Sequence, residues 1–446
     1  MCQLRLRLRL RLVRLRLRRW RGILMKRSIQ VDGQTVRLSL REEAGVFLLN
    51  INGSHILHLN ETAAAYAKLI MDEVPRDTAV ASIRRLYDVE REDAERDYEQ
   101  VFFSIATLAT RKDVCPYSYL GVKNVTFGGT ELSAPFRFDL ALTYRCNNNC
   151  AHCYMGGPQD RPEYTTAQWK QVIDKADALE VGAVVFTGGE PTLRNDLVEL
   201  VDYNHDLVTG LVTNGRLLTP ELVSRLEAAE LDHIQITVEG LEKTHDAMVG
   251  ATGAYRETMA GIKAALDSHI FTLTNTTLTT QNCAEFPALL ELLHGMGLSH
   301  IAVNSIIYSG KAADADYGLS AVEAKEQLEA IMGLAADRGM DLVWYTPTRR
   351  CEFDPVEMGL GLKCCSAARV NVTIEPDGTV LPCQSWFESM GNILEDPWDA
   401  IWNSELARAI RAKAYMPASC EGCEHEDNCT AGCPLERDGK GCSPLG

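Results

Sequence analysis

Cysteine is the residue type in this chain of 446 residues whose number and spacing most clearly indicate chemistry. The chain contains 15 cysteines, and they lie in clusters. A chain of this length buries a core without disulfide crosslinks, so a small disulfide-stapled module is excluded. Clustered thiolates are typical ligands of soft metals and iron–sulfur centres. The pattern therefore predicts metal chemistry.

The first cluster consists of Cys146, Cys150 and Cys153. This spacing is expected by chance only about 0.02 times in a chain of this composition. Three thiolates on one loop can converge on one soft-metal centre, but a closed tetrahedral zinc site needs a fourth ligand. An iron–sulfur cubane held by three cysteines leaves one iron open to a small ligand.

The second cluster lies near the C-terminus, and its spacing is expected by chance about 0.0006 times. Its members are Cys420, Cys423, Cys429 and Cys433. Cys365, the segment Gly378-x4-Cys383 and Cys442 lie on either side of it. The last hundred residues are rich in cysteines and turns and show little periodicity.

Strands and helices alternate from residue 136 to about residue 340, which indicates an α/β fold with a parallel sheet. The candidate strands are 137–144, 183–189, 209–215, 234–240, 271–277 and 301–307. Polar motifs sit where these strands end. In α/β barrels the active site lies at that edge.

Here the sequence resembles the radical S-adenosylmethionine (SAM) superfamily. Cys146-Asn-Asn-Asn-Cys150-Ala-His-Cys153 matches its CxxxCxφC motif, with His152 in the aromatic position. The resemblance implies a partial (β/α)6 TIM-type barrel with a 4Fe-4S cluster on the three cysteines and SAM at the open iron. It also implies that SAM is cleaved to a 5′-deoxyadenosyl radical, which removes a hydrogen atom from the substrate.

The same resemblance implies a set of SAM contacts at the strand ends. They are Gly188, Gly189, Glu190, Thr237, Glu239 and Asn275. The first three resemble the GGE segment that binds the SAM amino group. Thr237 and Glu239 replace the Ser and Asp of an SxDG segment near the ribose or carboxylate, and Asn275 falls where the family places a polar contact.

One position departs from the family pattern. Many relatives carry an arginine for the SAM carboxylate where this chain has Val249, and we interpret the nearby Arg256 as a surface charge. No catalytic acid or base is assignable beyond the cluster; His245 and Tyr154 are within reach, but such residues usually serve packing.

The C-terminal cysteines resemble a SPASM domain, which typically holds two auxiliary iron–sulfur clusters; a zinc ribbon is the alternative. The implied outer ligands are Cys420, Cys423, Cys429 and Cys442, and the implied inner ligands are Cys365, Cys383 and Cys433. For the fourth inner ligand we favour Cys351, with Cys364 or an open iron as alternatives. Cys2, Cys115 and Cys283 are spare, as is Cys364 under this assignment.

Residues 26–111 predict a winged-helix-like α+β domain, with hairpins in 28–40 and 45–59 followed by helices. The hairpins, the segment 58–65 and the closing acidic helix resemble a PqqD-like domain, the RiPP recognition element. That resemblance implies capture of a precursor-peptide leader as an added strand. With 11 basic and 14 acidic residues, this segment has no positive excess for DNA.

The ends of the chain add two expectations. Residues 1–25 predict a disordered or non-native Leu/Arg leader, with the true start at Met25, and residues 112–135 predict a linker. Without the nine leader arginines, the formal charge changes from −16 to −25, which argues against nucleic-acid or anionic-membrane partners. The barrel is expected over 136–340 and the SPASM domain over 341–446.

Together these observations predict a radical SAM/SPASM oxidoreductase that modifies a ribosomally made precursor peptide by crosslinking or oxidation. Its partners would be that peptide and an electron donor such as flavodoxin or ferredoxin, in the reducing cytoplasm. Alternatives within the enzyme class are a sulfatase-maturase-like or a tetrapyrrole-modifying enzyme. The alternative outside it is an iron–sulfur redox sensor that contacts DNA through its winged helix.

Overall fold

The computed structural model describes residues 25–31, 34–43, 46–51, 55–110, 132–204 and 207–436. The predicted leader except Met25, most of the predicted linker, Cys2, Cys115 and Cys442 lie outside these ranges. The chain divides into two compact units near residue 134. Among the residues described, no helix is long and apolar enough to cross a membrane.

The N-terminal unit consists of a sheet followed by three helices. Its antiparallel strands are, in sheet order, β1 (Met25–Val31), β2 (Gln34–Glu43), β3 (Val46–Ile51) and β4 (His55–Leu59). Its helices are α2 (Glu61–Met71), α3 (Arg76–Tyr87) and α4 (Arg91–Thr110). The prediction of hairpins before helices is confirmed, and the winged-helix description stays a prediction.

Sequence pattern explains how this unit forms. In β2 the buried residues Val36, Leu38 and Leu40 alternate with half-buried ones, which directs the apolar side chains to one face of the sheet. Asn60 begins α2, because its side-chain Oδ1 accepts a hydrogen bond from Ala63 N at 2.8 Å. As described, the sheet ends at β1 and β4, so each has one edge without a neighbouring strand.

The second unit is built on one long sheet. Seven consecutive strands of the sheet run parallel and form the barrel: β5 (Arg137–Thr143), β6 (Ala183–Gly188), β7 (Val208–Thr213), β8 (His233–Thr237), β9 (Phe271–Leu278), β10 (His300–Ser305) and β11 (Asp341–Trp344). β11 ends the sheet and does not pair with β5, so the barrel is open. The predicted partial barrel is confirmed, and β11 adds a parallel strand at one side of the six expected.

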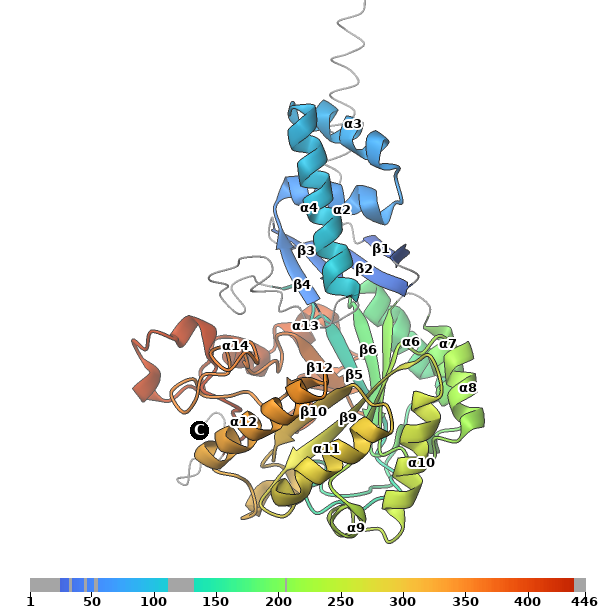
Figure 1. The fold of residues 1–446 in the computed structure, drawn as a ribbon, viewed down its shortest axis with the longest axis vertical. Helices are drawn as coiled ribbons and strands as arrows, with labels where there is room; N and C mark the ends of the chain where they lie inside the picture. Colours follow the sequence, from blue (N-terminus) through green and yellow to red (C-terminus); the bar gives the residue numbers. More distant parts are fainter. Residues whose placement is uncertain are drawn as a thin grey trace, which may run out of the picture. The chain divides into compact units, whose positions relative to one another are not determined.

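Helices connect these strands, and Figure 1 shows several of them beside the sheet. They are α6 (Thr166–Ala178), α7 (Leu197–Tyr203), α8 (Pro220–Ala228), α9 (Glu242–Val249), α10 (Ala254–Leu266), α11 (Phe286–Gly295) and α12 (Ala321–Asp337). Thr165 and Ser320 form capping boxes that begin α6 and α12. The strands β6 and β7 are buried along nearly their whole length, as parallel strands covered on both faces must be.

The sheet continues beyond residue 340, where the sequence predicts the barrel to end. Besides β11, the strand β12 (Asn371–Ile374) pairs in parallel with β5 on the side away from β6, and Asn371 Nδ2 donates to Asp139 Oδ2 at 2.8 Å. The antiparallel strands β13 (Thr379–Leu381) and β14 (Gly391–Asn392) extend the sheet further. Two short helices, α13 (Trp398–Trp402) and α14 (Glu405–Arg411), follow. The strands β11 to β14 have only two to four residues each, too few to show the alternation of apolar and polar residues by which a strand is recognised in a sequence.

Candidate functional site

Cys146, Cys150 and Cys153 lie on the loop that follows β5, and neighbouring elements hold this loop from two sides. On one side, Asn149 N donates to Val249 O at 2.8 Å and Ala151 N donates to Met248 O at 2.9 Å, both at the end of α9. On the other side, Lys311 N donates to Cys153 O at 2.9 Å. All three thiols are half-buried and outside any disulfide. The structure therefore brings the predicted triplet to the carboxyl edge of the sheet.

The surroundings of these thiols suit a positively charged centre. Burial raises the pKa of Cys146 to about 11, and it raises the pKa of Cys150 further, with the nearby thiols and Glu239 adding to the shift. Asn148 N donates to Cys146 Sγ at 3.4 Å. Buried thiolates that repel one another are stabilised when a metal centre supplies positive charge.

The glycine pair at the end of β6 allows that strand to approach the root of the cysteine loop. An added Cβ would lie 2.3 Å from Thr143 O at Gly188 and 2.3 Å from Arg145 O at Gly189. Gly189 N donates to Thr143 O at 2.7 Å. Only glycine fits at this contact, so both residues have a demonstrated packing role, and their contact with SAM stays a prediction.

Glu190, the third residue of the segment, has a fully buried carboxylate. It accepts hydrogen bonds from Thr192 N at 3.0 Å, Thr213 Oγ1 at 2.7 Å and Asn214 N at 2.8 Å. Burial raises the pKa of Glu190, although these hydrogen bonds oppose the shift. Its carboxylate thus ties the end of β6 to the end of β7.

Glu239 is also fully buried, and it forms an ion pair that the sequence does not reveal. Its Oε1 lies 3.0 Å from His152 Nε2, and its Oε2 accepts from Thr277 N at 2.9 Å. Burial alone would lower the pKa of His152, but the charge and hydrogen bond of Glu239 raise it overall. The residue in the aromatic position of the cysteine motif therefore anchors the loop to the segment after β8.

Asn275 on β9 lies opposite Thr237 on β8 in the sheet register. Its Nδ2 donates to Asn304 Oδ1 at 2.8 Å, whereas its Oδ1 is buried and has no hydrogen-bond partner within the described residues. An unsatisfied buried acceptor favours a bound donor group. Asn275 is therefore a predicted SAM residue with an acceptor atom available for a ligand.

The remaining residues named near the motifs have local partners. His245 Nδ1 accepts from Glu239 N at 3.1 Å, and Tyr154 Oη donates to Gly188 O at 3.4 Å. Burial lowers the pKa of His245 and favours its neutral form. Arg256 forms a surface ion pair with Glu242 at 2.8 Å, in agreement with its interpretation as a surface charge.

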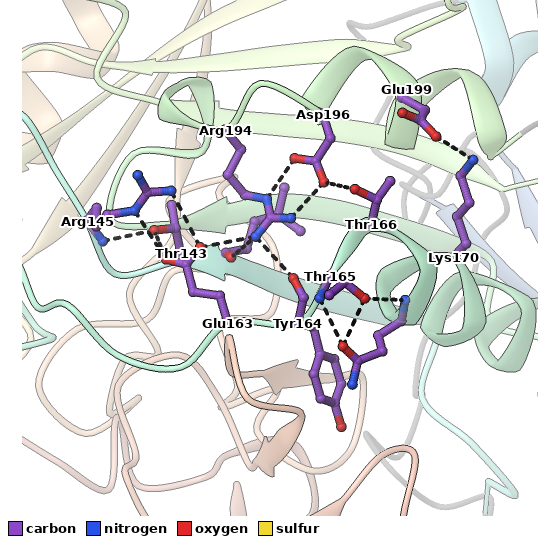
Figure 2. A network of polar contacts seen from close by, with 12 residues as sticks. Thr143, Arg145, Glu163, Tyr164, Thr165, Thr166, Lys170, Arg194, Asp196 and Glu199 are labelled. Atoms are coloured by element: carbon purple, nitrogen blue, oxygen red, sulfur yellow. Dashed lines mark hydrogen bonds and ion pairs between the residues drawn. The ribbon is translucent and has the colours of Figure 1, made fainter.

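Arg194, which the sequence analysis did not select, connects the segment after β6 to the end of β5. Figure 2 shows Arg194 within a network of polar contacts that includes Glu163 and Asp196. Arg194 binds Asp196 with two hydrogen bonds of 2.9 and 2.7 Å, and its Nη1 donates to Glu163 Oε2 and Leu142 O at 3.2 Å each. Its side chain is 8% exposed. The only sequence signal is its place four residues after Glu190.

A second unpredicted feature is the segment from Ser309 to Lys311, which we call the bridge segment. Ser309 Oγ donates to Ser385 O at 2.8 Å, two residues after Cys383, while Lys311 N bonds Cys153 O. At Gly310, with φ +56°, an added Cβ would lie 2.2 to 2.5 Å from main-chain atoms of Cys153, Tyr154 and Gly156. The bridge segment thus joins the first cysteine loop to a loop of the C-terminal region.

The described C-terminal cysteines form two groups. Cys365 and Cys433 belong to the buried group: burial raises the pKa of Cys365 to about 12, with Cys383 adding to the shift, and Cys365 and Cys383 act in the same direction on Cys433. The other group is nearer the surface, where burial and the charges of Cys429, Cys351 and Cys423 raise the pKa of Cys420. Cys442 lies outside the described residues.

The donor set fits iron–sulfur clusters. Within the described ranges, no three Cys, His, Asp or Glu side chains are close enough to share a single metal ion. A cubane distributes its thiolate ligands over different iron atoms, so its ligands need not meet at one point. Cys146, Cys150 and Cys153 would hold the SAM-binding cluster, and the two C-terminal groups would hold the auxiliary clusters.

Comparison with known families gives three matches along the chain. The radical SAM superfamily model matches residues 140–293, and the iron–sulfur cluster-binding SPASM model matches residues 364–424. The model of coenzyme PQQ synthesis protein D matches residues 45–104.

Individual relatives agree with these matches. An AdoMet-dependent heme synthase of Methanosarcina barkeri is 29% identical over 68% of this chain and 91% of its own length. The PqqA peptide cyclase of Bradyrhizobium diazoefficiens is 31% identical over 67% of this chain and 81% of its own length. The structure of Streptococcus suis SuiB bound to precursor peptide SuiA superimposes with a TM-score of 0.68 at 14% identity, covering 92% of this chain and 96% of that one.

Replacing Arg194 by methionine should destabilise the barrel unit. The substitution leaves the carboxylates of Glu163 and Asp196 without their main partner, which costs roughly 3 kcal/mol in free energy of unfolding. Urea titration followed by tryptophan fluorescence reports this unit, because the described tryptophans all lie in it. Arg256→Met, which removes an exposed ion pair, should cost less than about 1 kcal/mol. Equal losses in both variants would refute the proposed network.

Replacing Gly310 by alanine should displace Cys153 and lower the iron content of the reconstituted protein. The matched control is Gly339→Ala, since Gly339 has a similar φ of +64° but open space around it. Both variants lose about 1–2 kcal/mol from the left-handed backbone conformation. Only Gly310→Ala should also lose iron, measured colorimetrically per chain. An unchanged iron content in this variant would show that the bridge segment does not position the loop.

Proposed function

The chain belongs to the radical SAM superfamily of enzymes and carries a SPASM domain, and we propose that it modifies a ribosomally made precursor peptide. The observation that carries the proposal is the PqqD-like unit, which the same chain joins to the barrel and the cysteine-rich region. The PqqA peptide cyclase relative is named for a peptide substrate, and SuiB was solved with a precursor peptide.

The cofactors of this family are a SAM-binding 4Fe-4S cluster, auxiliary iron–sulfur clusters and SAM. When bound, they supply one-electron radical chemistry that removes a hydrogen atom from the substrate. The protein's part is to position them. Glu190 and the His152–Glu239 pair hold the strand ends and the cysteine loop, while Asn275 offers an acceptor atom to SAM. The buried strands behind this edge exclude water.

The N-terminal sheet supplies a means of capturing a peptide. Its strands β1 and β4 each have an edge without a neighbour in the described sheet, and an extended leader can add there through main-chain hydrogen bonds. Because residues 26–111 carry three more acidic than basic residues, the unit does not favour nucleic acid. A peptide leader is therefore the better ligand for this unit.

A second candidate is modification of a tetrapyrrole, because one relative is named a heme synthase. The heme synthase and peptide cyclase relatives cover nearly the same share of this chain at similar sequence identity, so sequence similarity does not distinguish the two functions. The PqqD-like unit favours the peptide. A sulfatase-maturase-like activity and a DNA-binding redox sensor have no comparable feature in their support.

Two further parts of the proposal concern the setting of the reaction. Thiolate-ligated clusters need a reducing compartment, which favours the cytoplasm. Radical SAM chemistry also needs an external electron, and a flavodoxin or ferredoxin would supply it.

Co-expression tests the substrate. A short reading frame beside the gene, encoding a leader and a core peptide, is expressed anaerobically with the full chain, and the peptide mass is measured. We expect a mass change with the full chain and none with Cys150→Ala or with a chain that begins at Lys112. Modification by the shortened chain at the full rate would contradict leader capture.

Two measurements without substrate turnover complete the test. With SAM and a chemical reductant, the full chain and a Cys283→Ala control should both form 5′-deoxyadenosine, whereas Cys150→Ala should form none. Added leader peptide should slow amide hydrogen exchange on β1 or β4. Slowed exchange on neither strand would exclude strand addition while leaving the radical chemistry intact.

A further inference from the structure

Arg41 and Arg369 are the two most deeply buried arginines of the described residues, with exposed fractions of 3% and 6%. Arg41 pairs with Glu43 at 3.2 Å, as a buried guanidinium normally does. Arg369, in contrast, has no carboxylate partner in the part of the chain that the structure describes. Because an arginine stays protonated in proteins, Arg369 is a buried positive charge that still needs an anion.

The hydrogen bonds of Arg369 satisfy only part of its guanidinium. Its Nη2 donates to Ile410 O at 3.0 Å and to Arg411 O, at the carboxyl end of α14. A helix end carries about half of one negative charge, so these carbonyls offset the positive charge only in part. The Nε of Arg369 is buried and has no hydrogen-bond partner within the described residues. One buried donor is therefore left for a further acceptor.

Arg369 belongs to the turn that follows Cys365, a predicted ligand of the inner auxiliary cluster. Arg369 N donates to Ser366 O at 3.1 Å, and this hydrogen bond closes the turn. Cys365 N donates to Thr430 Oγ1 at 2.7 Å, and the predicted inner ligand Cys433 follows three residues after Thr430. The turn that carries Arg369 is thus bonded to the segment that carries a second inner ligand.

The acidic groups around Arg369 agree with this placement. Burial lowers the pKa of Arg369, and the charges that oppose the shift are those of Tyr415, Cys365 and Cys364. None of the three is a carboxylate. Burial raises the pKa of Tyr415, so its hydroxyl is neutral at ordinary pH and cannot balance the guanidinium. The anion that Arg369 needs must therefore come from the cysteine group.

We propose that Arg369 is the counter-ion of the inner auxiliary cluster and raises its reduction potential. An iron–sulfur cluster with thiolate ligands carries a net negative charge, and the uptake of one electron makes that charge more negative. A buried positive charge beside the cluster favours the reduced state, because little water screens the attraction. Arg369 thereby makes the inner cluster a better one-electron acceptor.

Redox titration of the full chain tests the inference, which rests on the auxiliary-cluster part of the proposed function and not on the substrate. The chain is reconstituted anaerobically with iron and sulfide, and the reduced clusters are followed by electron paramagnetic resonance (EPR). The signal that is missing from a Cys365→Ala/Cys383→Ala variant belongs to the inner cluster. Failure of the peptide assay would leave this measurement unchanged.

Arg369→Met should lower the potential of the inner cluster and shift its reduction equilibrium by roughly tenfold or more, which corresponds to about 59 mV for one electron. Arg369→Lys keeps the charge and should retain most of the potential. Arg408→Met is the matched control, since it removes the same charge from an exposed position of α14, where water and salt screen it. The control should shift the equilibrium less than about twofold.

Two results would overturn the assignment directly. One is an unchanged inner potential in Arg369→Met, and the other is an equal loss in Arg369→Met and Arg369→Lys, which would show an effect of packing and not of charge. The absence of any EPR signal that depends on Cys365 and Cys383 would overturn it as well. If Arg369→Met does not fold, Arg369→Gln replaces it, and the comparison with Arg369→Lys decides in the same way.

Discussion

The loop that carries Cys146, Cys150 and Cys153 contains no helix or strand, so its shape depends on hydrogen bonds from outside it. Fixing a residue of such a loop costs about 1–2 kcal/mol in backbone entropy. The end of α9, the bridge segment and the His152–Glu239 ion pair offset this cost from three parts of the sheet edge. The rest of the barrel can be understood as the support that brings these three anchors together.

Two buried carboxylates illustrate how the support is made. Glu190 after β6 and Glu239 after β8 are both fully buried at strand ends on either side of β7, where an unpaired charge would be very unfavourable. Each is satisfied by groups from a different segment, so each works as a crosslink between strand ends. Glu190 and Glu239 therefore hold the main chain of the strand ends in place at the carboxyl edge of the sheet.

Local signals in the sequence were sufficient to predict much of this arrangement. The cysteine spacings, the six parallel strands and the hairpins before helices involve residues that are close in sequence, so the printed order reveals them. Contacts between distant residues could not be predicted in this way. His152 and Glu239, Ser309 and Ser385, and β12 and β5 are partners only because the fold brings them together. Arg194 was missed because a single arginine after a turn has no distinguishing pattern.

The pairing of β12 with β5 has a consequence for how such proteins can be divided. The first barrel strand lies between β6 and β12, so the main chain of its residues 137–140 is paired on both sides. A chain ending at residue 340 would expose one side of residues 137–140 in β5, together with the edge of β10 that β11 covers. Exposed strand edges promote aggregation through pairing with other chains. The barrel and the cysteine-rich region therefore form one structural unit, and a chain is better divided at the boundary near residue 134 than at residue 340.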